Sequence, residues 1–239
     1  MTCSRGVTLI HLGRGLFDQF HSSELSDELA ALYREHGVEL LLEQEVAGFG
    51  GDDRLSYVET KSGLCVEAEL VVVGVGVKPN VDFLADSGLA LDNGVVVNQR
   101  FQTQAAGVFA AGDVANFFDP LYGRQRRIEH WSNANYQGNE VGKVLAGNGG
   151  GYDTVSSFFS EVFGTTVKVF GDVSRFDERT TEGSLMSGAL LTSYGDSGRL
   201  VGALTVGASD ELETELRDLI ADHAPTGALE RELVAGRSR

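Results

Sequence analysis

The sequence predicts an α/β protein, and three features of its 239 residues support this class. The first is a β-α-β order of apolar and helical patterns in the first third of the chain, which is typical of parallel sheets. The second is LVVVGVGVKPN at residues 70–80, which reads as a fully buried strand running into a glycine turn. The third is GVFAAGDVANF at residues 107–117, in which a short apolar run stops at a glycine and an acid.

The first elements alternate between strand and helix. Residues 7–12 read as a buried strand, and residues 38–42 read as the next one. Between them, Ser22 or Ser23 can cap a helix whose first turn is acidic and which stops at Gly37. The apolar face of this helix is formed by Leu25, Leu29, Leu32 and Tyr33.

Residues 45–73 change character. Short apolar segments at 46–49, 55–60 and 64–67 are separated by the turn sequences GGDD and KSG. This pattern predicts a small antiparallel meander that leads into the buried strand at residues 70–77.

The middle of the chain continues with short elements. Residues 82–89 predict a short helix, residues 95–98 a short strand, and residues 108–111 a short buried strand. A longer helix is predicted from about residue 132 to residue 145, with Ser132 as its N-cap.

The sequence GNGGG at residues 147–151 is the clearest linker. Beyond it, residues 155–206 read as several strands joined by glycine-containing turns. Residues 209–223 predict an acid-rich amphipathic helix. Its apolar side consists of Leu212, Leu216, Leu219 and Ile220.

Composition restricts the class of function. The 35 acidic and 19 basic residues give a net charge of −16, which argues against nucleic acid or an anionic membrane as the main partner. Adaptation to a salty cytoplasm would also explain the excess of acidic residues. Cys3 and Cys65 lie far apart, so neither a disulfide framework nor a zinc site is indicated, and no metal is expected. With no segment of transmembrane length and no signal-peptide core, we expect a cytoplasmic protein.

Two glycine-containing strand ends suit nucleotide chemistry. Gly74 and Gly76 leave room for a nucleotide or ring to approach the backbone, although an ordinary turn explains them as well. Gly112 permits a sharp turn, and Asp113 then stands at the carboxyl end of a strand, where an acid can accept a hydrogen bond from a sugar or polyol hydroxyl. The alternative for Asp113 is a cap or turn residue.

A third segment, RIEHWSNA at residues 127–134, places Glu129, His130 and Trp131 directly before a helix N-terminus. The unpaired N–H groups there favour negative charge and would suit a cofactor whose reduced form is an anion. A buried tryptophan beside a satisfied histidine is the alternative. No G-x-G-x-x-G occurs anywhere in the chain, so a phosphate cradle of that type is not indicated.

Together these segments resemble the FAD-dependent pyridine-nucleotide oxidoreductases of the ferredoxin and rubredoxin reductase group. VVVGVGVKPN, GVFAAGDVANF and RRIEHWSNANYQG recur there in this order and at about these spacings. The resemblance implies an α/β flavoprotein made of two Rossmann-like dinucleotide-binding units and an α+β C-terminal reductase domain. Residues 1–78 would be the remaining part of the NAD(P)H-binding domain, residues 79–150 the returning half of the FAD-binding domain, and residues 151–239 the C-terminal domain.

The resemblance also implies roles for individual residues. Asp113 would hold the ribityl chain of FAD, and the segment from Glu129 to Trp131 would lie along the flavin and nicotinamide. Glu129 and Trp131 are the expected catalytic residues. The expected cofactor-binding residues are Gly112, Asp113, His130, Trp131, Ser132, Gly74, Gly76, His11, Arg14 and Phe159. Phe159 stands where the group typically has a tryptophan.

The choice between NADH and NADPH is open. In a complete dinucleotide-binding unit, an acid at the end of the second strand usually pairs with the ribose hydroxyls of NAD. The strand at residues 7–12 would be that strand, and it has His11 at this position, with Arg14 nearby. The change would admit the phosphate of NADP, or it is neutral.

The sequence departs from this group in one respect. Members carry G-x-G-x-x-G units before the regions matched here, and both units are missing. We therefore expect the C-terminal part of a longer enzyme. Because those glycine loops hold both pyrophosphates, we expect this polypeptide alone to bind FAD weakly or not at all.

The activity implied by the resemblance is hydride transfer from NAD(P)H to FAD, followed by single-electron steps to a ferredoxin- or rubredoxin-like carrier. The basic run GRQRR at residues 123–127 would meet an acidic carrier, or it is a solvated loop. One rival is an NADH oxidase or coenzyme A disulfide reductase, which the resemblance of the C-terminal domain disfavours. The other is a non-catalytic remnant or interaction module, which the missing glycine loops support.

Overall fold

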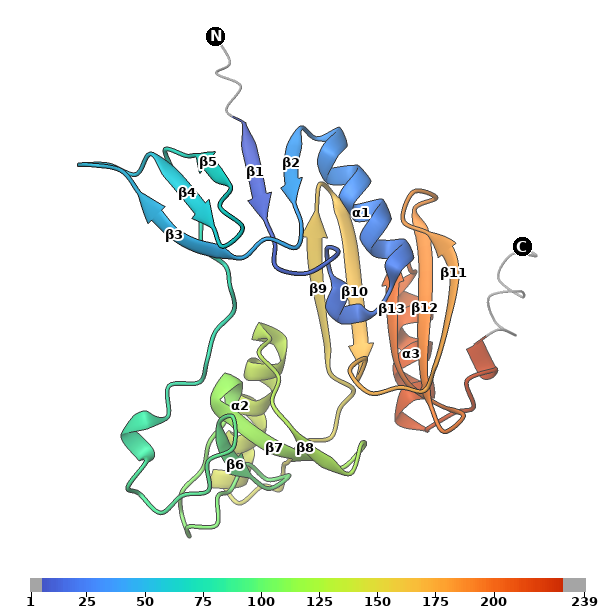
Figure 1. Ribbon diagram of the computed structural model, residues 1–239. Helices are drawn as coiled ribbons and strands as arrows, with labels where there is room; N and C mark the ends of the chain where they lie inside the picture. The colour runs from blue at the N-terminus through green and yellow to red at the C-terminus, as the bar shows by residue number, and fades with distance from the viewer. Residues whose placement is uncertain (1–5, 230–239) are drawn as a thin grey trace. The chain divides into compact units, whose positions relative to one another are not determined.

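The computed structural model describes residues 6–229 (Figure 1). The chain forms two compact units. The first unit comprises the residues up to Val75 together with Thr181–Thr192, and the second comprises Gly76–Thr180 and the residues from Ser193 onward. Cys3 lies outside the described residues, whereas Cys65 is exposed and has a free thiol. None of the described helices is both long and apolar enough to span a membrane.

The first unit begins with the predicted β-α-β order. Strand β1 (Val7–Ile10) pairs in parallel with β2 (Val38–Leu41), and α1 (Ser23–Glu35) connects them. Ser22 is the N-cap, because its hydroxyl accepts a hydrogen bond from the Leu25 N–H at 3.3 Å. A single 3-10 turn, η1 (Asp18–Phe20), precedes this helix. The β-α-β order was therefore predicted correctly, but the first strand ends at Ile10 rather than at residue 12 and is not buried, since Val7 is 57% exposed.

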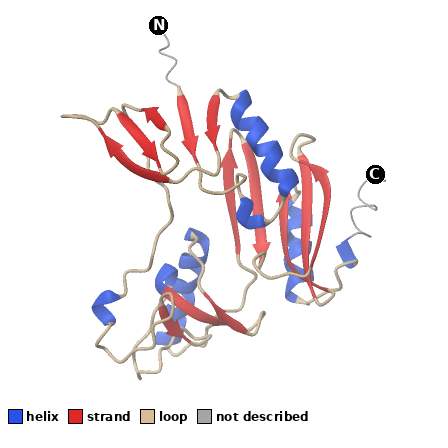
Figure 2. Ribbon diagram, in the orientation of Figure 1, coloured by secondary structure: helices blue, strands red, loops and turns tan. Residues whose placement is uncertain are grey.

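The predicted meander is also confirmed. Strands β3 (Val46–Gly50), β4 (Tyr57–Thr60) and β5 (Cys65–Glu67) form a three-stranded antiparallel sheet in sequence order. An irregularity in pairing between Val46 and Gly48 bends the first strand. Figure 2 shows these strands separated by short turns.

The predicted buried strand at residues 70–77 is wrong. The segment has no regular secondary structure, and its apolar side chains are exposed, for example 77% for Leu70, 89% for Val72 and 86% for Val75. A central parallel strand is buried because neighbouring strands pair with both of its edges. No strand among residues 6–229 pairs with this segment, so its side chains face solvent.

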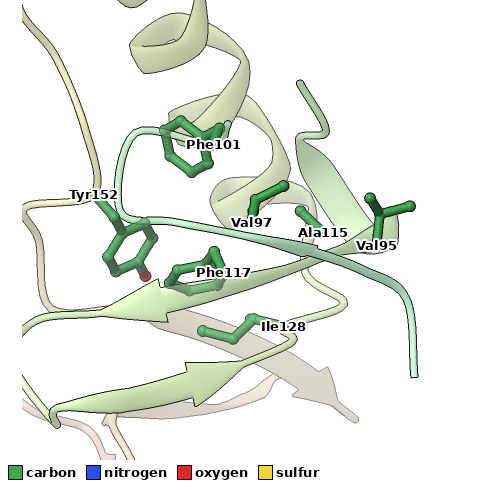
Figure 3. Close-up of a cluster of buried hydrophobic side chains, with 7 residues drawn as sticks. All are labelled: Val95, Val97, Phe101, Ala115, Phe117, Ile128 and Tyr152. Atoms are coloured by element: carbon green, nitrogen blue, oxygen red, sulfur yellow. The ribbon is translucent and has the colours of Figure 1, made fainter. Parts of the chain in front are cut away.

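The second unit starts with less helix than predicted. Only one 3-10 turn, η2 (Asp82–Leu84), forms where residues 82–89 predicted a short helix. Strand β6 (Val95–Val97) then pairs in parallel with β7 (Ala115–Asp119), and β8 (Arg124–Arg126) pairs antiparallel with β7. Residues of β6 and β7 are the centre of a buried apolar cluster (Figure 3). Its buried members are Val95, Val97, Phe101, Ala115, Phe117, Ile128 and Tyr152.

The predicted buried strand at residues 108–111 is wrong as well. Phe109 makes one isolated bridge to Gln102, and Val108 is 39% exposed. As at residues 70–77, no described strand lies beside this segment to complete a ladder. The chain instead continues into a 3-10 turn, η3 (Gly112–Val114).

The long helix α2 (Trp131–Leu145) starts slightly earlier than predicted. Its N-cap is His130 rather than Ser132, and no side chain caps its first N–H groups. The expected linker follows, with positive φ at Gly147, Gly149 and Gly150. It ends at the fully buried Tyr152, whose N–H donates to the Gln99 carbonyl oxygen at 2.8 Å.

A five-stranded sheet and a helix complete the chain. The strand order is β11-β12-β13-β10-β9. The strands are β9 (Ser157–Val162), β10 (Thr165–Gly171), β11 (Glu178–Ser184), β12 (Ala189–Asp196) and β13 (Arg199–Val206). The predicted final helix is α3 (Asp210–Ala221), which packs against β13 and β10 through Leu216 and Ile220. Ser209 caps it by accepting from the Leu212 N–H at 3.3 Å.

Buried ion pairs join the β7–β8 hairpin to the end of β10. Arg126 Nη1 lies 2.7 Å from Asp119 Oδ2, and its Nε lies 3.7 Å from Asp172 Oδ2. Arg124 also pairs with Asp172. Burial raises the pKa of Asp119 although Arg126 opposes the shift. Burial acts in the same direction on Asp172, but the charge of Arg126 and hydrogen bonds from Ser174 lower its pKa overall.

The basic run at residues 123–127 is therefore neither a solvated loop nor a free docking patch. The Arg126 side chain is 9% exposed and Arg127 is 11% exposed, and both are ion-paired within the second unit. The nearby Tyr122 hydroxyl donates to the Val201 carbonyl oxygen at 2.8 Å. Gly171 makes this approach possible, because a Cβ there would lie 2.7 Å from the Tyr122 hydroxyl.

Candidate functional site

The turn at Gly112 packs against helix α2. Gly112 has φ of 80°, a conformation that favours glycine. Its N–H donates to Gln137 Oε1 at 2.8 Å. A Cβ built on Gly112 would lie 3.7 Å from the Ala134 Cβ. The turn is thus fixed against the first two turns of the helix, and it presents the exposed side chain of Asp113.

Arg127 holds the same turn from its other side. Its Nη1 donates to the Asp113 carbonyl oxygen at 3.1 Å and also pairs with the Glu129 carboxylate. The Glu129 side chain is 32% exposed. A guanidinium that binds the main chain and a carboxylate at once fixes the Asp113 backbone relative to Glu129. Arg127 therefore holds the main chain at Asp113 and the side chain of Glu129 in a fixed relative position.

Two buried donors beside this turn have no acceptor within the described part of the chain. They are Arg127 Nε and Gln137 Nε2. A buried donor left without an acceptor costs roughly 1–3 kcal/mol. Both residues use their other polar atoms to hold Gly112 and Asp113. Unpaired donors of this kind are expected beside a bound group that supplies hydrogen-bond acceptors.

His130 is stacked and half-buried. Its ring lies 4.0 Å from that of Phe158 with an interplanar angle of 21°. Burial lowers the pKa of His130 below its ordinary value, and the charges of Asp113 and Glu129 oppose part of this shift. His130 is therefore mainly neutral at pH 7.

Exposed aromatic rings lie next to this stack along the chain. Trp131 is 84% exposed and Phe159 is 67% exposed, so the alternative of a buried tryptophan is wrong. The Ser132 hydroxyl donates to the Ser157 carbonyl oxygen at 2.7 Å, which ties the first turn of α2 to the start of β9. Large exposed aromatic side chains of this kind commonly mark a binding surface.

The other predicted site residues lie elsewhere. His11, Arg14 and Gly74 belong to the first unit, and Gly76 begins the second. The buried His11 Nε2 has no hydrogen-bond partner within residues 6–229, whereas Arg14 Nε lies 3.3 Å from Glu43 Oε1 in an exposed ion pair. No atom lies within 4 Å of a Cβ built on Gly74 or Gly76, so both glycines leave open space.

The sequence-based list of site residues missed Arg127, Gln137 and Phe158. Gln137 had a detectable signal, because it lies three and four residues beyond Ala134 and Asn133 and thus on the same face of the helix. Arg127 stood inside the selected motif, but nothing local indicated that it would bind the main chain at Asp113. The described residues contain no cluster of His, Cys, Asp or Glu suited to a metal ion.

Comparison with known proteins gives a consistent set of similarities. The chain is 28% identical to putidaredoxin reductase CamA of Pseudomonas putida over 222 residues, which is 92% of this chain and 52% of that protein. It is 32% identical over 203 residues to the ferredoxin reductase component of chlorobenzene dioxygenase from Cupriavidus sp. (strain PS12), covering 84% of this chain and 49% of that protein. The chain thus spans about half the length of these relatives.

Solved structures agree. The covalent putidaredoxin reductase–putidaredoxin complex matches with a TM-score of 0.86 at 26% identity, over 98% of this chain and 58% of the matched one. A ferredoxin reductase from Rhodopseudomonas palustris matches with a TM-score of 0.83 at 26% identity, over 91% and 54% of the two chains. The family model described as pyridine nucleotide-disulphide oxidoreductase covers residues 2–138, more than half of the sequence. The chain therefore belongs to the pyridine nucleotide-disulphide oxidoreductase family.

Proposed function

We propose that this chain is part of an FAD-dependent NAD(P)H oxidoreductase that passes electrons to a ferredoxin- or rubredoxin-like carrier. The observation that carries the proposal is the Gly112–Asp113 turn, which Gln137 and Arg127 hold against the start of α2. The names of the similar proteins, two ferredoxin-system reductases among them, support the same reading.

The residues at this turn fit FAD. The exposed Asp113 carboxylate can accept hydrogen bonds from the ribityl hydroxyls, and the uncapped N-terminus of α2 favours a negatively charged ring edge. The unsatisfied donors of Arg127 and Gln137 fit a neighbouring group that supplies acceptors. When bound, FAD supplies the ability to accept a hydride and to release electrons one at a time.

The protein's own residues have distinct roles in this proposal. Asp113 orients the polyol chain, while Trp131 and Phe159 cover aromatic faces and exclude water. Ser132 fixes the first turn of α2 through its bond to Ser157. Glu129, which is paired with Arg127, would contact the reacting rings. The neutral His130, stacked on Phe158, adds no positive charge that would compete with the N-terminus of the helix.

The remaining assignments concern the nicotinamide cofactor and the domains. Gly74 and Gly76 offer room for close approach of a nucleotide, and His11 and Arg14 are assigned to its ribose end. We assign residues 1–78 to the NAD(P)H-binding domain, residues 79–150 to the FAD-binding domain and residues 151–239 to the C-terminal reductase domain. A reducing cytoplasmic location fits the free thiol of Cys65.

A second candidate function is a non-catalytic interaction module. The exposed apolar side chains between Leu70 and Val77 favour it, because large exposed apolar segments commonly mark interaction surfaces. Under this alternative the turn at Asp113 would have no affinity for a flavin.

The single tryptophan of the chain, Trp131, provides a direct test. FAD is titrated into the purified protein while tryptophan emission is recorded, and, because the glycine loops that hold the pyrophosphates are missing, we expect weak quenching that develops only at high FAD concentration. Asp113→Asn should raise the FAD concentration at half-quenching by about ten-fold, because it weakens charge-assisted hydrogen bonds. The matched control, Asp86→Asn, changes an exposed acid outside the site and should leave the midpoint unchanged. Equal quenching curves for D113N and D86N would reject the flavin site.

A further inference from the structure

A cavity of about 260 Å³ lies in the second unit, between the turn after β7 and the strands of the C-terminal sheet. No residue of the Gly112–Asp113 turn or of the first turn of α2 lines it. It is therefore separate from the proposed flavin site, and binding of a ligand there does not depend on the proposed function.

The base of this cavity is rigid and electrically balanced. Tyr122, Arg124 and Asp172 line it. The Asp172 side chain is 5% exposed, pairs with Arg124 and Arg126, and accepts from the Ser174 N–H at 3.0 Å. The Tyr122 hydroxyl is fixed on the Val201 carbonyl oxygen. These groups shape the cavity, but their charges are already compensated.

Two further guanidinium groups at the rim differ from those at the base because no described carboxylate pairs with them. Arg175 and Arg199 line the cavity and are exposed, and neither forms an ion pair with a described residue. Arg199 Nη1 donates to the His223 carbonyl oxygen at 3.1 Å, which leaves its remaining N–H groups available. In a chain of net charge −16, two uncompensated guanidiniums at one cavity form a local anion-binding surface.

Asp196 restricts which anion can bind. Its carboxylate stands on the same rim and accepts a hydrogen bond from the Ser197 hydroxyl at 3.2 Å. A ligand with negative charge on all sides would be repelled by Asp196, whereas a ligand hydroxyl could donate to it. Leu121 and Val201 add an apolar wall that suits a short carbon chain.

The volume limits the size of the ligand. Pockets for drug-sized molecules span about 300–1,000 Å³, so this cavity is below that class. We propose that it binds a small organic anion that carries a carboxylate or phosphate group beside a hydroxyl group. Arg175 and Arg199 would bind the acidic group, and Asp196 would accept from the hydroxyl.

Calorimetric titration tests this proposal with four probes at equal ionic strength: malate, succinate, glycerol 3-phosphate and chloride. Succinate lacks the hydroxyl of malate, and the phosphate ester distinguishes the two acidic groups. We expect saturable binding of malate or glycerol 3-phosphate, weaker binding of succinate and none of chloride. Failure of malate and glycerol 3-phosphate to saturate, or equal heats with chloride, would overturn the site.

Variants then assign the binding to the rim. The double substitution Arg175→Gln and Arg199→Gln should weaken binding by about ten-fold or more, as expected for loss of charge-assisted hydrogen bonds. The control pair Arg54→Gln and Arg100→Gln removes the same charge from exposed positions elsewhere and should change affinity less than about two-fold. Equal losses in the two double variants would mean that only net charge matters and would overturn the site.

Asp196→Asn tests the hydroxyl contact. This substitution should abolish the preference for malate over succinate while retaining the dependence on the two arginines. An unchanged preference would remove the hydroxyl from the proposal and thus contradict the ligand class. Far-ultraviolet circular dichroism of each variant confirms that the fold is intact, which is expected because the three rim side chains are exposed.

Discussion

The tripeptide Val-Val-Val occurs at residues 71–73 and again at residues 95–97, and the two copies differ in solvent exposure and in secondary structure. In the first, Val72 is 89% exposed and Val73 is 61% exposed, and the segment has no regular structure. In the second, Val95 is 4% exposed and Val97 is 1% exposed within β6. The same side chains are therefore either solvent-exposed or at the centre of a core.

The difference arises from long-range pairing. Residues 95–97 pair with β7, which places Val97 opposite Phe117 in the cluster of Figure 3. Residues 71–73 have no such partner among the described residues. Local propensity for a strand is thus realised only where another strand satisfies the backbone and covers the side chains.

The largest effect is expected from removing the partner side chain. Phe117→Ala should lower the free energy of unfolding by about 3–5 kcal/mol, because Phe117 is fully buried against Phe101 and Tyr152. Its neighbour Phe118 is 39% exposed and is the matched control, for which Phe118→Ala should cost far less. Urea denaturation measures both. Similar losses for the two variants would show that β7 does not have the described inner face.

The same valine-to-threonine substitution, made in each of the two valine runs, should give the next largest effect on stability. Val97→Thr places a hydroxyl in the core and should lower the free energy of unfolding by about 1–3 kcal/mol. Val72→Thr makes the same chemical change at an exposed position and should stay within about 0.5 kcal/mol of the parent protein. Chemical denaturation of the two variants side by side checks this. A large loss for Val72→Thr would mean that residues 71–73 are covered in solution.

A smaller effect on stability is expected from the half-buried, titratable side chain of His130. Burial lowers the pKa of His130 in the folded protein, so the unfolded chain takes up the proton first as the pH falls. This contribution to stability should be complete above the ordinary histidine pKa of about 6.5 and decline as the pH falls below it. His130→Phe keeps an aromatic ring on Phe158 and should remove this part of the pH dependence. Identical profiles of unfolding free energy against pH would contradict the burial of His130.

The smallest effect on stability is expected at the exposed valines. Replacing Val72 and Val75 with lysine should change the free energy of unfolding by less than about 0.5 kcal/mol per site. Self-association should nevertheless fall, because charge interrupts an exposed apolar segment with strand propensity. Light scattering against protein concentration measures this. Unchanged scattering would exclude residues 70–77 as a self-association surface.

The sequence predicts the locally determined elements well. Helix α1 follows from its serine cap and apolar face, and the β3–β5 meander follows from short apolar segments with intervening turns. The buried strands expected at residues 70–77 and 108–111 are not formed, because their burial depends on strands elsewhere. The N-cap of α2 lies two residues earlier than predicted, at His130 instead of Ser132, and no side chain caps the helix.

The candidate site divides in the same way. Gly112, Asp113 and the segment from Glu129 to Ser132 were selected from motifs, and the structure places the first two in a 3-10 turn and the others at the start of α2. The residues that hold them were not selected, since the bond between Gly112 and Gln137 joins positions 25 residues apart. The basic run at residues 123–127 was misjudged for a related reason: its acidic partner Asp172 lies 48 residues beyond Arg124, directly after β10.

The ion pairs of Arg124 and Arg126 with Asp119 and Asp172 have a consequence for how the chain comes apart. They join two stretches of polypeptide that lie on either side of the glycine-rich segment at residues 147–151. Proteolytic nicking of that segment would sever the covalent connection and still leave both pieces bound to each other. Their separation would require denaturant, because salt screens buried ion pairs weakly, so we do not expect the boundary most visible in the sequence to be a boundary for cooperative unfolding.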